Sequence, residues 1–121
     1  MSNYKDTPYP LWTLFCVGDI VHYRTFSFKT DSAEDFISKA LARLQTEINQ
    51  ITELHMHGAI SAIAVNFDIP YSKPEPTVIQ LHPLIEPISK QCSRDFMWDF
   101  SFTNLDVYSV NVFIGVSTIP K

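Results

Sequence analysis

Glycine is scarce in this sequence, with three residues among 121. A loop that cradles phosphate groups, of the Walker or dinucleotide-binding type, needs several closely spaced glycines. The sequence therefore argues against nucleotide chemistry by these standard loops.

Basic residues are also few: nine Lys and Arg stand against thirteen Asp and Glu, which gives a formal charge of −4. Nucleic-acid binding depends on clustered Lys and Arg, so we expect no nucleic-acid partner. No segment approaches the roughly 18 consecutive apolar residues that a membrane helix needs, and the start, residues 1–7, is polar rather than signal-like. We expect a cytoplasmic protein without a membrane partner.

The sequence has two cysteines, too few for a disulfide framework. Cys16 lies in an apolar run and Cys92 in a polar one, so free thiols are the favoured interpretation and their pairing stays open. No serine occupies a G-x-S-x-G turn, and we predict no catalytic residue.

Histidine offers one suggestive pair, His55 and His57, near the end of a predicted helix. Residues two apart in a helix point in different directions, so the pair would not share a metal unless the helix had already ended. Further ligands would be needed, and nothing in the sequence fixes them nearby. We therefore predict no metal and no cofactor, and expect these rings to interact with the negative end of the helix dipole.

A β-hairpin is predicted near the start, from the runs 11–17 and 20–29 on either side of Gly18-Asp19. In the second arm, His22 and Arg24 share a face with Phe26 and Phe28 because strand side chains alternate.

A long amphipathic helix follows. Asp31 and Glu34 have the spacing of a capping box, and Asp35 adds negative charge to the first turn. Apolar residues then recur every three or four positions up to Leu54, which predicts about six turns ending near His57-Gly58.

The rest of the chain reads mainly as strands. Residues 63–69 alternate as in a half-buried strand, 71–76 form a proline-containing loop, and 77–81 are compatible with a short strand. Residues 84–92 allow a turn or two of helix, with Pro87 tolerated only in a first turn. Two further strands, 96–102 and 108–116, flank a short turn and predict a second hairpin.

These elements predict one α+β domain over residues 1–121, with an antiparallel sheet of five to six strands and the long helix packed on one face. Aromatic residues make up 13% of the chain and gather in strands. One covered face cannot hide them all, and Trp12 and Phe113 are predicted to point away from the helix. Exposed apolar groups of this kind mark association, so we predict a homodimer.

Two functional hypotheses follow. The favoured one is a non-catalytic binding or accessory protein that acts through a protein partner, of the inhibitor, immunity or phage and mobile-element type. The alternative is a small-molecule-binding protein or small enzyme with an aromatic-lined pocket. The candidate ligand- or partner-binding residues common to both are His22, Arg24, His55, His57, Trp12 and Phe113.

Overall fold

The computed structural model describes residues 19–56 and 59–117. The first arm of the predicted N-terminal hairpin, residues 11–17, lies outside the described residues, so that hairpin stays a prediction. Its second arm forms a strand as expected. The elements in chain order are β1 (Ile20–Phe28), α1 (Ala33–Leu54), β2 (Ile60–Pro70), α2 (Val78–Ser89), β3 (Asp95–Thr103) and β4 (Tyr108–Val116).

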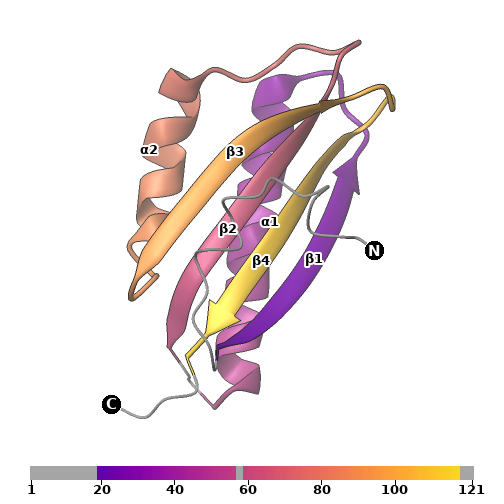
Figure 1. The fold of residues 1–121 in the computed structure, drawn as a ribbon. Helices are drawn as coiled ribbons and strands as arrows, with labels where there is room; N and C mark the ends of the chain where they lie inside the picture. Colours follow the sequence, from indigo (N-terminus) through magenta and orange to yellow (C-terminus); the bar gives the residue numbers. More distant parts are fainter. Residues whose placement is uncertain (1–18, 57–58, 118–121) are drawn as a thin grey trace.

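The strands form a four-stranded mixed sheet in the order β1-β4-β2-β3. β4 runs antiparallel to both β1 and β2, whereas β2 and β3 are parallel. Figure 1 shows both helices behind this sheet, on the same face. The predicted antiparallel sheet of five to six strands with one helix is therefore wrong in strand number, strand direction and helix number.

The predicted second hairpin is also wrong, although both of its strands form. β3 and β4 are joined by a short turn, but β2 lies between them and pairs with both. A connection of this length usually joins paired strands. Here α2 carries the chain from β2 to a parallel β3, and the turn then passes across the end of β2.

The long helix α1 confirms the clearest sequence pattern, with two adjustments. Its N-cap is Ser32 rather than Asp31, because the Ser32 side chain accepts a hydrogen bond of 3.1 Å from the backbone N–H of Asp35. At the other end His55 is the C-cap, and Met56 takes the left-handed conformation with φ of 55°. Gly58, predicted for that role, lies outside the described residues.

Helix α2 shows that the strand expected over 77–81 is wrong and confirms helix within 84–92, although it begins earlier, at Val78, and ends at Ser89. Leu81, Ile85 and Ile88 are buried at helical spacing. Pro83 and Pro87 both lie inside the helix and both are exposed. Being four residues apart, they remove hydrogen-bond donors on one side only, which faces away from the core. Burial of the apolar face therefore stabilises the helix by more than the two prolines destabilise it.

The core lies between the sheet and the two helices, with fully buried side chains from α1, β2, α2 and β4. β2 was expected to be half-buried, but it is buried on both faces. Ala62 and Ala64 point away from the helices and are covered by Met97 and Phe113. Neither described helix is long and apolar enough to cross a membrane.

Candidate functional site

A row of side-chain contacts joins β1 to α1, and we call it the β1/α1 seam. Its contacts run in opposite order along the two elements, because the strand and the helix point in opposite directions. The pairs are Phe28 with Phe36, Phe26 with Arg43, Arg24 with Glu47, and His22 with His55.

Arg24 and Glu47 form the charged part of the seam. Arg24 Nε donates to Glu47 Oε1 at 3.1 Å, while Arg43 Nε lies 3.7 Å from Glu47 Oε2. Glu47 is buried, and its carboxylate is shared between the two guanidinium groups. Arg43 also lies over the ring of Phe26 at 4.4 Å. The charges on this seam are therefore largely satisfied within the molecule.

His22 and His55 form the last contact of the seam, near the start of β1 and the end of α1. Their Nε2 atoms are 2.8 Å apart, so one ring must donate and the other must accept as a neutral imidazole. Burial of the ring, followed by the positive charges of His55 and Arg24, lowers the pKa of His22. The contact therefore cannot form when both rings are protonated.

The sequence-based candidates divide into three groups. His22 and Arg24 on β1 lie on the same seam as His55 on α1, although the strand and helix residues are far apart in sequence. Phe113 lies on the opposite face of the sheet, as predicted. Trp12 and His57 lie outside the described residues.

Glu47 is not among the residues that the sequence singles out as candidates. It lies three residues after Leu44 and four before Ile51, and both of these are buried. A charged residue on the apolar stripe of a helix is the signal that could have found it.

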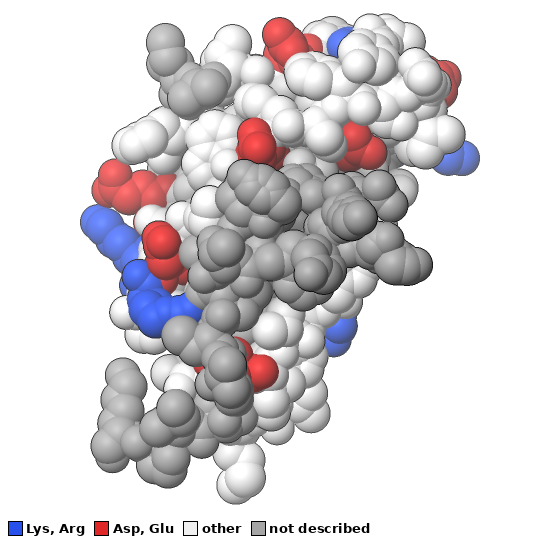
Figure 2. Space-filling view, viewed as in Figure 1, with Lys and Arg blue, Asp and Glu red and all other residues white. Residues whose placement is uncertain are grey.

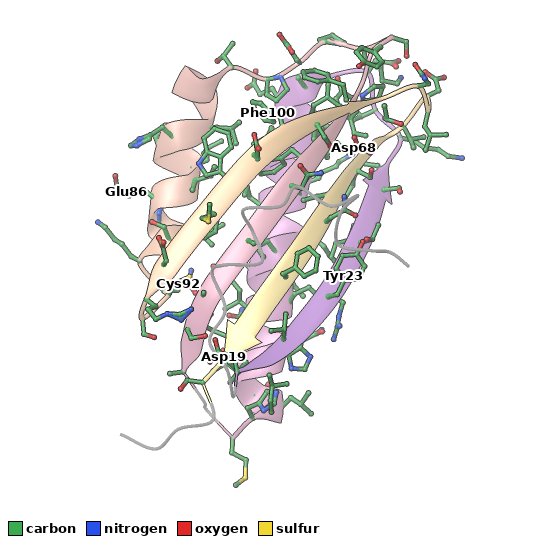
Figure 3. All side chains as sticks on the ribbon, in the orientation of Figure 1. Asp19, Tyr23, Asp68, Glu86, Cys92 and Phe100 are labelled. Atoms are coloured by element: carbon green, nitrogen blue, oxygen red, sulfur yellow. The ribbon has the colours of Figure 1, made fainter. Side chains whose placement is uncertain are left out.

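The face away from the helices carries a small polar and aromatic network. Tyr23 and Phe113 contact each other with ring centroids 4.8 Å apart. Tyr23 Oη donates to Asn111 Oδ1 at 3.0 Å, and the Thr25 hydroxyl donates to Tyr23 Oη at 2.6 Å. Figure 3 shows Tyr23 on β1 and Asp68 on β2, on this face of the sheet.

Apolar groups also gather at the other end of the molecule, where β2 and β3 end. We define the loop-end patch as Tyr71, Phe102 and Leu105, all exposed. Tyr71 is 71% exposed and stacks on Phe102, which is 44% exposed, at 5.6 Å. Lys73 and Glu75 line a hollow of about 330 Å³ with these two rings.

A second hollow, of about 390 Å³, lies beside the loop-end patch. The residues that line it are Lys29, Thr30, Asp31, Lys73, Asp106 and Val107. Lys73 forms an ion pair with Asp31, which lowers the pKa of that carboxyl group. Neither hollow is lined by the histidines and arginines of the seam.

Metal binding has no support in the described geometry. Among residues 19–56 and 59–117, no group of three or more His, Cys, Asp or Glu could hold a metal ion. Figure 2 shows acidic and basic side chains interspersed on the described part of the viewed face, so charge does not mark a binding surface there.

No protein-family model and no curated protein matches the chain. Among solved structures, the chain has a distant likeness to thiamine monophosphate kinase from Aquifex aeolicus, with 9% sequence identity and a TM-score of 0.46. The match covers 81% of this chain and 33% of that one, so the chain spans about a third of that protein's length.

Proposed function

We propose that this protein is a non-catalytic binding protein that forms a homodimer and acts through a further protein partner. The observation that carries the proposal is the position of the aromatic residues outside the core. They lie at two separate places, Tyr23 with Phe113 on one face of the sheet and Tyr71 with Phe102 at its loop end, and they do not converge on one common cavity. Exposed apolar groups on open surfaces favour a macromolecular partner over a small molecule.

The loop-end patch is the surface we assign to the further partner. Tyr71 and Phe102 hold each other in place by stacking, so less side-chain freedom is lost when a partner covers them. Aromatic anchors surrounded by polar groups are typical of the residues that dominate binding energy. Lys73 and Glu75 supply that polar rim.

Affinity capture from the source lysate with the full chain tests this assignment. The variant carries Tyr71→Ser and Phe102→Ser, and the control carries Leu84→Ser at an exposed position on α2. Each truncated anchor weakens binding by roughly thirtyfold, so the double variant should lose a partner that the unaltered chain and the control retain. Equal recovery of the same proteins by all three chains contradicts the proposal, as does recovery of none by the unaltered chain.

The small-molecule alternative rests on the seam residues facing a ligand. Arg24 instead bonds Glu47, and His22 instead bonds His55. Substituting Arg24 with Ala should therefore change stability. Loss of a bound small molecule at unchanged stability would revive the alternative.

A further inference from the structure

The two edge strands of the sheet, β1 and β3, differ in how their outer backbone groups are used. On β3, the N–H of Phe96 donates to Asp95 Oδ1 at 2.8 Å, and the N–H of Phe100 donates to Asp99 Oδ1 at 2.8 Å. These carboxylates occupy donors that an added strand would need. Charged side chains that block an edge in this way prevent pairing with another chain.

Helix α2 adds to the protection of β3. His82 and Glu86 on the helix line a hollow together with Phe96 and Trp98 on the strand. Figure 1 shows α2 running along this border of the sheet. A strand approaching β3 would therefore meet both the aspartates and the helix.

β1 is less protected among the described residues. Its nine residues pair with β4 in unbroken register, and the strand contains neither proline nor lysine. In the described parts of the chain, one side chain bonds a backbone group of β1: Arg24 Nη1 donates to the carbonyl oxygen of Tyr23 at 2.9 Å. An edge that is long, regular and lacking lysine or proline is a template for another strand.

The bond to Tyr23 also shows which residues face outward. In an antiparallel strand the N–H and C=O of one residue point to the same side, and residues two apart share that side. Because the Tyr23 carbonyl is reached from the outer side, Val21 and Thr25 also direct their backbone groups outward. We call Val21, Tyr23 and Thr25 the outward set.

Exposed apolar side chains gather on the same strand. Ile20 is 41% exposed, Val21 38% and Tyr23 51%. Leu54 and Met56, at the end of α1 that the His22–His55 contact ties to β1, are exposed as well. Covering this group would remove apolar surface from water at the place where the backbone can also pair.

We propose that β1 pairs with β1 of a second copy, antiparallel and about a twofold axis, so that one sheet continues through both copies. This pairing uses the edge that the predicted N-terminal hairpin would give to residues 11–17, so the proposal replaces that hairpin. The inference rests on the homodimer in the proposed function and names its surface. A twofold axis brings the same surface together on both chains, which suits a strand with one charged residue. That residue, Arg24, already pairs with Glu47, whereas pairing two β3 edges would bring the carboxylates of Asp95 and Asp99 from both copies onto one shared edge.

The test compares solution masses of the unaltered chain, Thr25→Pro and Thr25→Val by native mass spectrometry and light scattering. Both variants lose the Thr25 hydroxyl and its bonds to Tyr23 and Asn111, but only the proline removes an outward N–H. An unaltered circular dichroism spectrum checks the fold. We expect dimers for the unaltered chain and Thr25→Val. For Thr25→Pro we expect at least about a tenfold weaker dimer. The substitution is present in both chains, so the dimer loses two backbone hydrogen bonds.

Each of the other outcomes contradicts one part of the proposal. If the unaltered chain and Thr25→Pro dimerise equally, the β1 surface is wrong while the homodimer stands. If the unaltered chain has the mass of one copy, both are wrong, and only the further partner at the loop-end patch stays to be tested.

Disulfide trapping keeps the inference testable if the proline variant does not fold. Val21→Cys, Tyr23→Cys and Thr25→Cys are oxidised beside the unaltered chain and a Ser101→Cys control on β3. At least one cysteine of the outward set should cross-link two copies, at least about tenfold more than the control, because opposing strand positions lie within disulfide reach. Equal cross-linking by the control contradicts the β1 surface.

Discussion

The two halves of α1 meet the sheet through different chemistry. In the first half, Phe36 is buried and stacks on Tyr108 at 4.6 Å, with Phe67 edge-on at 6.1 Å. The second half also buries Leu44, Ile48 and Ile51 in the core, but Glu47 and the C-cap His55 add ionisable contacts with β1. One helix therefore combines an apolar anchor, whose contribution to stability does not depend on pH, with a polar seam, whose contribution does.

The largest expected effect comes from the anchor. Replacing Phe36 with Ala should lower the free energy of unfolding by about 3–5 kcal/mol, because it leaves a cavity among packed rings. Urea unfolding measures the change. Phe102→Ala, at an exposed ring, serves as the control and should have a much smaller effect. Equal losses in the two variants would mean that Phe36 is not the anchor.

Cys92 lies beside the second half of α1, in a hollow with Ile48 and Thr52. Burial, and to a lesser degree the charge of Asp95, raises the pKa of its thiol to about 11 from 9.0. The thiolate fraction at pH 8 should therefore fall about a hundredfold relative to an unperturbed cysteine. A Cys16→Ser chain treated with a thiol reagent, before and after unfolding in urea, measures this. Equal rates in the two states would contradict the burial of Cys92.

Glu47 tests the polar seam directly. Glu47→Gln should destabilise the fold by about 1–2 kcal/mol, because two guanidinium groups lose their shared carboxylate. The matched control is Glu53→Gln at an exposed position on the same helix. A loss no larger than that of the control would show that solvent already satisfies Arg24 and Arg43.

The smallest expected effect is the pH dependence of the His22–His55 contact. The pKa of His22 is lowered in the fold, so the unfolded chain binds the proton more readily. This contribution to stability should be complete above about pH 6.5, the unfolded value, and should be lost as the pH falls towards the folded pKa. Urea midpoints at several pH values measure it. His22→Gln should flatten the acid side of the curve, and an unchanged curve would argue against the contact.

The fold could be predicted from the sequence wherever local patterns decide it. α1 follows from its apolar spacing, although Ser32 and Asp31 both suit an N-cap and the structure uses the serine. The first part of α2 was missed because residues 77–81 are also compatible with a strand, and Pro87 limits the helix expected after residue 84 when the burial of Ile85 and Ile88 is unknown. The strand order was missed because a short turn after β3 predicts pairing with β4, whereas the insertion of β2 depends on contacts distant in sequence.

In the candidate site too, local patterns could be predicted and contacts between residues distant in sequence could not. Strand alternation identified His22 and Arg24, but it could not show that their partners are His55 and Glu47 on the helix. Arg24 was a candidate for binding a ligand or partner, and in the structure it meets an internal carboxylate.

The place of β4 has a consequence for how the chain reaches this structure. Among the described strands, β1 pairs with β4 alone, as in Ile20 with Val116. A ribosome releases β1, β2 and β3 before the strand that joins β1 to the others. Until β4 emerges, β1 has no partner among the described strands. Such sequence-distant pairing slows folding, so this chain completes its sheet late and exposes its most pairing-prone strand for most of its synthesis.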